Sequence, residues 1–434
     1  MKPTGLLIAV VLLAGLGGVV WWSNRQQAKA DNKKSDTTVK LLSIPDDQFQ
    51  NIRIKKVTGE AEDLVRENGK WKLTEPKPLP ADQDTVSGMV TNLSSLNADN
   101  VIEEKPSDLK QYGLAAPALT IDVKRKDGKT DELLIGDDTP TGSGVYAKLA
   151  NDPRVVTIAS FIKTSLDKTP NDLRDKRLMT FDQDKITRVD LEAKGQPLEF
   201  GKDAQGEWRI LKPRPLRADS SAVNGVVDKL RDAKMDLSGA GDTNKQFASS
   251  QKVAVAIVAD AAGNHTIEVR KDKDKNYYAK STDVEGAYKI ASDTGDALDK
   301  GLDDFRNKKL FDFGFSDPSK VDANGAVYDK SGDKWMSAGK PMDNSTVQNL
   351  IDKLRDLSAT KFVDSAAGQP VFTATVTSNN GKRVEKVTIR KQGDQYFAQR
   401  ENEPSIYQLD AKSVDDLQAA AKDVKPAPPE TKKK

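Results

Sequence analysis

The pattern of apolar residues repeats three times along the chain. In each copy an Asp stands four residues before a Val, and apolar residues then recur at spacings of three and four; the aspartates are Asp82, Asp219 and Asp343. This spacing places one apolar stripe along an α-helix, and an Asp carboxylate accepts hydrogen bonds from the free N–H groups of the first turn. The sequence therefore predicts one Asp-capped amphipathic helix in each copy.

A tryptophan-containing strand is predicted before each of these helices. The segments WKLTEPKPLPAD from Trp71 and WRILKPRPLRAD from Trp208 are nearly the same, and a weaker copy begins at Trp335. Each Trp follows a turn signal that ends in Gly, which indicates a strand returning from a hairpin. We expect the three tryptophans to lie in the core. Prolines stiffen the loop between strand and helix, because they fix φ and lack an N–H donor.

Alternating apolar and polar residues predict further strands after each helix. The first two copies close with similar helical segments, LRDKRL at 173–178 and FRNKKL at 305–310, whereas the third is expected to stop before this element. Strands grouped around helices without strict βαβ alternation predict an α+β fold. The sequence thus predicts three tandem repeated domains, at 41–178, 179–311 and 312–424, each a mainly antiparallel sheet with a capped amphipathic helix.

The amino terminus carries the pattern of a membrane anchor. Residues 5–22 contain no charge, and as a helix they measure about 27 Å, close to the hydrocarbon thickness of a bilayer. A cleavable signal peptide ending near the AKA of Ala28–Ala30 is the alternative. We predict a transmembrane helix at 1–22, a polar linker at 23–40 and a disordered Pro/Lys tail at 425–434.

The orientation of this anchor rests on two opposing signals. Lys2 precedes the apolar run, whereas Arg25, Lys29, Lys33 and Lys34 follow it, and this balance of positive charge alone would place the bulk of the chain in the cytoplasm. A very short basic start followed at once by an apolar run is instead how export signals are built. We expect a single-pass protein of the cytoplasmic (inner) membrane with the bulk of the chain outside the cytoplasm.

Composition narrows the chemistry that the chain can perform. The 68 Lys and Arg residues nearly balance the 66 Asp and Glu residues, so no net field favours nucleic acid, and we expect no nucleic-acid partner. The chain contains no Cys and one His, His265, which excludes disulfides, thiolate metal sites and sites that need two histidines. We predict no cofactor, no metal site and no catalytic residue.

Several motifs together resemble the bacterial family called domain of unknown function 4340. Besides the Trp strand, the Pro loop ending in Ala-Asp and LRDKRL, they are YGLAAP at Tyr112–Pro117 and LLIGDDTPTGSGVYAK at 133–148. The resemblance covers most of residues 41–311. It implies a membrane-anchored envelope protein, often encoded beside ABC-type transport components similar to gliding-motility auxiliary proteins. An ABC-type permease or an auxiliary envelope protein is therefore the expected partner besides the membrane, and the family has no known active site to carry over.

Short stretches that imitate reactive sites have simpler explanations. Ser160 and Lys163 fit an S-x-x-K pattern, but no companion motif accompanies them, and we expect Ser160 to cap a helix. DKDKN at Asp272–Asn276 imitates a calcium loop but has Tyr277 where Gly is needed, so we expect a hairpin turn. His265 follows Gly263 and Asn264 in a turn and is expected to be an exposed or half-exposed surface residue. Gly142–Gly144 is expected to form a hairpin turn.

One basic cluster is the candidate partner contact. Lys212, Arg214 and Arg217 lie in the second Pro loop. Stiffening by proline lowers the entropy cost of binding an acidic partner or a lipid headgroup. A solvated loop with no partner is the alternative.

Three functional hypotheses follow from these observations. The first is a non-enzymatic, membrane-anchored scaffold or accessory subunit of an ABC-type transport or gliding-motility-like system. The alternative is a cell-wall or polysaccharide binding module, which would use exposed aromatic side chains, namely Tyr277, Tyr278 and Tyr396. The third is an envelope hydrolase that uses carboxylates or Ser160.

Overall fold

A computed structural model describes residues 39–239, 241–314 and 318–428. The predicted anchor, nearly all of the linker and the last six residues of the tail lie outside this range. Two compact units divide the chain, residues 1–176 and 177–434, and each is described by itself. Within the described ranges, every helix is too short or too polar to cross a membrane.

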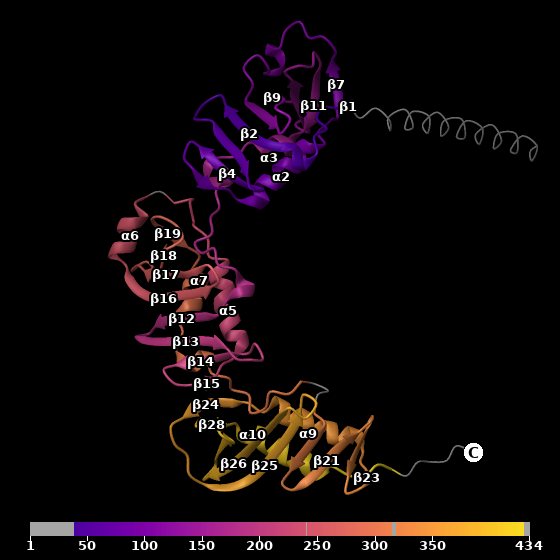
Figure 1. Ribbon diagram of the computed structural model, residues 1–434, viewed down its shortest axis with the longest axis vertical. Helices are drawn as coiled ribbons and strands as arrows, with labels where there is room; N and C mark the ends of the chain where they lie inside the picture. Colours follow the sequence, from indigo (N-terminus) through magenta and orange to yellow (C-terminus); the bar gives the residue numbers. More distant parts are fainter. Residues whose placement is uncertain (1–38, 240, 315–317, 429–434) are drawn as a thin grey trace, which may run out of the picture. The chain divides into compact units, whose positions relative to one another are not determined.

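The first unit is built on a nine-stranded sheet within residues 39–176 (Figure 1). All its strand pairs are antiparallel. The strands, in spatial order, are β5 (Leu79–Pro80), β4 (Lys70–Glu75), β3 (Glu62–Glu67), β2 (Phe49–Lys56), β8 (Leu119–Arg125), β9 (Thr130–Asp138), β10 (Gly144–Leu149), β11 (Val155–Ala159) and β7 (Asn100–Glu103). Helices α2 (Gln83–Ser94), α3 (Ser160–Leu166) and α4 (Pro170–Leu173) bury apolar residues in one core with the sheet. A small ladder, β1 (Val39–Lys40) with β6 (Asn97–Ala98), and two 3-10 turns, η1 (Asp46–Gln48) and η2 (Lys110–Tyr112), complete this unit.

The described part of the second unit contains two large antiparallel sheets. The first has eight strands in the order β15 (Leu216–Arg217), β14 (Trp208–Lys212), β13 (Gln196–Lys202), β12 (Arg188–Ala193), β16 (Gln251–Asp260), β17 (Gly263–Lys271), β18 (Tyr277–Ser281) and β19 (Ala287–Ile290). Its helical segments are η3 (Gln183–Lys185), α5 (Ser220–Arg231), α6 (Thr243–Ser249), α7 (Ser292–Leu298) and α8 (Leu302–Phe305).

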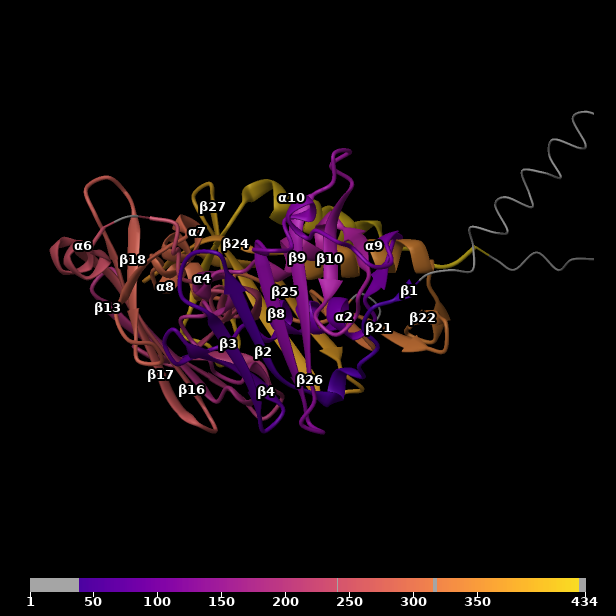
Figure 2. The same cartoon turned by 90° about the horizontal axis from the view of Figure 1, so that it is seen from above.

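The second of these sheets has nine strands. Their order is β23 (Lys340–Pro341), β22 (Lys334–Ser337), β21 (Ala326–Ser331), β20 (Lys320–Ala323), β25 (Gln369–Ser378), β26 (Arg383–Gln392), β27 (Gln395–Arg400), β28 (Ile406–Leu409) and β24 (Ala359–Val363). Helices α9 (Asn344–Asp356) and α10 (Ala411–Asp423) lie side by side on one face of it (Figure 2). We call the three sheets with their separate cores, which span 41–173, 178–305 and 310–417, the first, second and third sheet domains.

The three sheets share one order of strands. A strand hairpin leads to the Trp strand and then to the capped helix. A later strand, namely β8, β16 or β25, then returns beside the first strand of the hairpin. Trp71, Trp208 and Trp335 are all buried. The predicted caps are confirmed, because the carboxylates of Asp82, Asp219 and Asp343 each accept backbone N–H groups of the first helical turn. The helix stripes face the cores, and each fully buried Val, Leu or Met contributes about 1.5–3 kcal/mol.

Two motifs of the first unit, YGLAAP and LLIGDD, meet through their glycines. Gly113 has φ 69° and a Cβ built there would lie 2.5 Å from the Asp137 carboxyl, while a Cβ at Gly136 would lie 2.1 Å from the Tyr112 carbonyl oxygen. The turn after η2 therefore packs directly on the backbone of β9, an approach that a side chain at Gly136 would block. These motifs serve close packing of a turn on the sheet.

A short backbone pairing, which we call the clasp, closes the Pro-loop edge of each sheet domain. The N–H groups of the capping residues Asp82, Asp219 and Asp343 donate to carbonyls of later segments, at Leu173 (2.8 Å), Phe305 (2.8 Å) and Lys425 (2.9 Å). Because an open edge strand is a template for unwanted pairing, the clasp protects β5, β15 and β23.

The clasp of the third sheet domain corrects two expectations. We predicted that the third copy lacks the closing element and that the tail is disordered from residue 425. Both are wrong for 425–427: Pro426 bridges Met342, and the Ala427 N–H donates to the Pro341 carbonyl at 2.9 Å. Backbone pairing needs only an extended segment at this place. Residues 425–427 (Lys-Pro-Ala) can therefore take the role that residues 173–175 (Leu-Arg-Asp) have in the first sheet domain.

Truncation after Val424 should therefore destabilise the third sheet domain. Two backbone hydrogen bonds are lost, which corresponds to about 1–3 kcal/mol. Urea unfolding followed by far-UV circular dichroism would measure the change. A chain truncated after Pro428 keeps the clasp and should unfold like the full chain, and equal stability of both truncated chains would contradict this role of the clasp.

Candidate functional site at the junction of the second and third sheet domains

A short connector, residues 305–310, joins the second and third sheet domains. Its first half forms the clasp of the second sheet domain, where Asn307 N–H donates to the Arg217 carbonyl at 3.0 Å. Its second half pairs with the third sheet domain: Ala359 N–H donates to the Lys308 carbonyl at 2.8 Å, and Leu310 N–H donates to the Leu357 carbonyl at 3.0 Å. The backbone is therefore held on both sides, and no free linker remains between these two domains.

Arg217 lies at the centre of this junction. Its side chain is only 5% exposed and forms an ion pair with Asp312. One guanidinium nitrogen also donates to the Lys309 carbonyl at 2.8 Å and to the Tyr407 hydroxyl at 3.3 Å, and Nε lies 3.5 Å from Glu403. The Arg217 side chain, on β15 of the second sheet domain, thus makes its polar contacts with the connector and with the third sheet domain.

Neighbouring groups of the third sheet domain complete the network around Asp312. The Glu385 carboxylate accepts the Asp312 N–H at 3.0 Å and pairs with Arg400 at 3.1 Å. Arg383 donates to the Asp312 carbonyl at 2.6 Å and pairs with Glu207 of the second sheet domain at 2.8 Å. Opposite charges and hydrogen bonds compensate the charges buried here, which offsets the cost of removing them from water.

The pKa values of these groups reflect the same arrangement. Burial alone would lower the pKa of Arg217, but the charges of Asp312, Tyr407 and Glu403 outweigh it and raise that pKa. Burial would raise the pKa of Asp312, whereas Arg217 and Arg400 lower it. Burial, with the charge of Glu403, raises the pKa of Tyr407 to about 12. Arg217 and Asp312 are therefore both charged at neutral pH.

The predicted partner contact of Lys212, Arg214 and Arg217 is not one surface. Lys212 is exposed and pairs with Glu199 on the neighbouring strand at 2.5 Å, and Arg214 is exposed in the loop. Arg217 is buried, because it lies on the clasped edge strand β15 and faces the acidic groups of the junction. The prediction of a partner contact is wrong for Arg217, because its side chain binds Asp312 of the same chain.

The sequence analysis missed the residues that receive Arg217. Asp312, Glu403 and Tyr407 contact Arg217 directly, and Glu385 and Arg400 complete the network around Asp312. A signal was present in the repeat itself, since Arg217 stands where the other two copies carry Pro80 and Pro341. A charged residue that replaces proline in a single copy indicates a position whose role is specific to that copy.

His265 forms a second polar cluster, at a partly exposed position that agrees with the predicted half-exposed His. It lies on β17 with its side chain 13% exposed, its Nδ1 is 2.7 Å from Asp283, and its Nε2 is 3.4 Å from Asp260. The same carboxylates accept the N–H groups of Thr180 and Asp182, both at 2.7 Å. The cluster therefore holds the segment that enters the second sheet domain.

Titration of His265 should change stability with a defined sign. Burial lowers the pKa of His265, but the hydrogen bonds and charges of Asp283 and Asp260 outweigh it and raise the pKa above the ordinary 6.5. Stabilisation by the protonated ring is therefore complete below pH 6.5 and is lost as the pH rises through the raised pKa. On the acid side, the backbone N–H of Asp182 is the main group that lowers the pKa of Asp260 from 3.8 to about 2. The stabilisation by this carboxylate is therefore lost progressively as the pH falls from the first value through the second.

We expect His265→Gln to be less stable than the parent by about 1.5–3 kcal/mol near pH 6, the range for a hydrogen bond to a charged group. The difference should shrink at higher pH. Urea unfolding at a series of pH values would measure it, and the assignment is direct because the chain has one His. A difference that does not change with pH would contradict a protonated His265.

The tyrosines proposed as stacking surfaces are buried. Tyr277, Tyr278 and Tyr396 are exposed by only 2%, 4% and 6%. Tyr277 and Tyr396 lie in the main cores of the second and third sheet domains, and Tyr278 packs with Phe247 and Ala287 in a separate cluster. The polysaccharide-binding hypothesis therefore loses the residues on which it rested.

The other candidate motifs are structural. Ser160 begins α3, but the cap residue is Ala159 and no side chain caps this helix, so the predicted Ser160 cap is wrong. Lys163 pairs with Asp138 at 2.8 Å. Asp272–Asn276 forms the predicted turn between β17 and β18, and Gly142 and Ser143 lie in the predicted turn between β9 and β10. Among the described residues, no group of three or more acidic or His side chains is placed to hold a metal ion.

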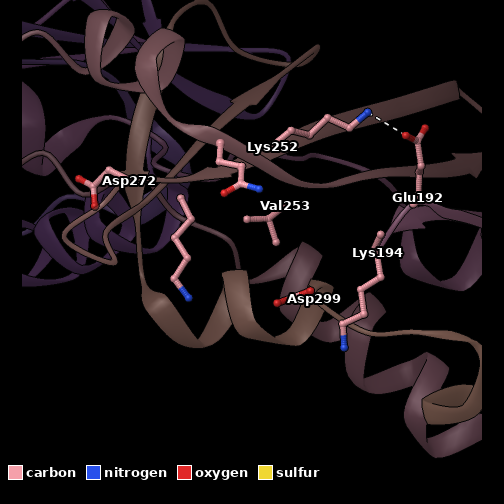
Figure 3. Close-up of a pocket in the computed structure, with 10 residues that line it drawn as sticks. Glu192, Lys194, Lys252, Val253, Asp272 and Asp299 are labelled. Atoms are coloured by element: carbon pink, nitrogen blue, oxygen red, sulfur yellow. Dashed lines mark hydrogen bonds and ion pairs between the residues drawn. The ribbon is translucent and has the colours of Figure 1, made fainter.

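Two hollows lie in the second unit. The first, of about 490 Å³, lies within the second sheet domain, where Figure 3 shows Glu192 and Lys252 paired across its wall at 2.8 Å. Its Lys271 donates to the Tyr277 hydroxyl at 2.8 Å. The second, of about 660 Å³, is lined by the connector, by the β13–β14 hairpin and by the start of α5. We call it the junction hollow.

Comparison with known proteins supports the family resemblance. The family model described as Domain of unknown function (DUF4340) matches residues 71–213 and 208–371. Each match begins at a buried Trp, in β4 or β14, and runs into the next sheet domain. No curated protein and no solved structure matches the chain. Two tandem matches over most of the chain show that this protein belongs to the family defined by the domain of unknown function DUF4340.

Proposed function

We propose that this protein is a non-enzymatic, membrane-anchored scaffold of the cell envelope that contacts a component of an ABC-type transport or gliding-motility-like system. The observation that carries the proposal is the connector between the second and third sheet domains. Its backbone pairs with both domains, and Arg217 fixes the junction with buried charge. A spacer between membrane and partner needs such fixed joints, whereas linkers without pairing behave as flexible coils.

The proposal includes three copies of the family domain. Support for the third comes from the shared strand order, the buried Trp335, the cap at Asp343 and the clasp at Lys425. Support for the anchor comes from the uncharged run at 5–22. The very short basic start before this run favours an orientation with the bulk of the chain outside the cytoplasm.

Site-specific crosslinking in the native membrane tests this function. A photo-crosslinking amino acid placed at Arg214, which is exposed in the Pro loop, is expected to capture a transport permease or its auxiliary subunit. The same amino acid at Lys273, in the exposed turn after β17, is the matched control. If the crosslinker at Arg214 captured only glycan, or only this protein, the scaffold function would be rejected.

A further inference from the structure

The junction hollow carries basic side chains that lack an acidic partner in the part of the chain that the structure describes. Lys202 and Arg209 come from the β13–β14 hairpin, and Lys308 and Lys309 come from the connector. Within the described residues, none of the four side chains takes part in an ion pair. Lys202 lies 5.1 Å from the centroid of the Trp208 ring, which favours a cation but leaves the charge uncompensated.

The acidic side chains of the same lining already have ion-pair or hydrogen-bond partners. Glu207 pairs with Arg383 at 2.8 Å, Asp219 caps α5, and Asp312 pairs with Arg217. Four like charges around one hollow repel each other and raise the local concentration of anions. The charge distribution therefore favours a bound anion with several charges.

The lining also indicates the kind of anion. The aromatic residues there, Trp208, Phe311 and Phe313, are buried, so little hydrocarbon is offered to a peptide or a lipid chain. Ser221 and Asn224 add exposed polar groups at the start of α5. A volume of about 660 Å³ lies in the range of small-ligand sites. Compact groups with dense charge gain most from lysine, which acts as a point charge.

We propose that the junction hollow binds closely spaced phosphate groups, either of a free oligophosphate or of a phosphodiester chain. The ligand contacts the hairpin of the second sheet domain and the connector together. This site is independent of the scaffold function, because it requires no protein partner.

Isothermal titration calorimetry of the full-length protein in detergent tests the proposal. The probes are inorganic tripolyphosphate and a short glycerol-phosphate oligomer, at low and at high salt. Binding should weaken with salt, because these charges are exposed. The double variant Lys308→Glu/Lys309→Glu should weaken binding about tenfold or more, as expected when two charge-assisted contacts are lost. Lys202→Glu should also weaken it.

The matched control is Lys273→Glu/Lys280→Glu, which changes the same charge at two exposed positions of the second sheet domain away from the hollow. It should bind like the parent. Tighter binding of tripolyphosphate identifies a free oligophosphate as the source, and tighter binding of the oligomer identifies a polymer. If neither probe binds the parent, or if both double variants lose binding equally, the proposal is wrong.

Discussion

Arg217→Ala is expected to uncouple the third sheet domain from the second. The substitution leaves the Asp312 carboxylate without its ion-pair partner in the junction, whereas Glu403 keeps Arg400 at 3.4 Å. Breaking a buried pair in this way costs about 3–5 kcal/mol. Hydrogen exchange of the full-length chain, followed by mass spectrometry, should show faster exchange in the connector and in β24 and β28. The strands β12 and β16, at the centre of the second sheet, should keep their protection.

Arg214→Ala is the matched control for this experiment. It removes the same side chain three positions away, at an exposed site, and should change stability by less than about 0.5 kcal/mol. Arg217→Lys keeps the charge but loses the planar fork that reaches several acceptors at once, so an intermediate effect is expected. If Arg217→Ala exchanged as slowly as Arg214→Ala, the junction would not depend on the ion pair.

Two helical glycines of the second sheet domain should respond to alanine with opposite signs. Gly295 lies in α7 against the Tyr277 ring, and a Cβ there would come within 2.2 Å of a ring carbon. Gly295→Ala therefore forces the helix or the ring to move, with a loss of about 1–3 kcal/mol. Thermal and urea unfolding of the purified variants would measure this loss.

Gly225→Ala is the control, because nothing lies within 4 Å of a Cβ built at this position in α5. Alanine there should stabilise the protein by about 0.5–1 kcal/mol through its higher helix propensity. Destabilisation of the same size in both variants would show that close packing on Tyr277 is not the cause.

The sequence predicted the locally encoded parts of this fold. An Asp cap, an apolar stripe at helical spacing and a Trp after a Gly turn each act over a few residues, so Asp219 and Trp208 could be placed without any tertiary information. The mainly antiparallel character of the sheets could also be predicted, because consecutive strands joined by short turns pair as hairpins.

The parts that escaped prediction depend on distant residues or on backbone alone. Arg217 and Asp312 are 95 positions apart, and nothing local shows that the loop carrying Arg217 faces the next domain. The sequence around His265 is typical of a turn, but the environment of its side chain is set by Asp283, 18 positions away. The clasp at Lys425 uses backbone groups, which leave no side-chain pattern to recognise.

The strand order has a practical consequence for preparing single domains. The second family match begins at residue 208, yet β12 and β13 precede this point and stand between β14 and β16 in the sheet. A fragment expressed from 208 would lack the middle of its own sheet, leave the ten-residue β16 with an open edge, and invite aggregation. Gene fragments designed for crystallisation should instead begin at residue 177, where the second unit starts, and extend past the clasp at 427.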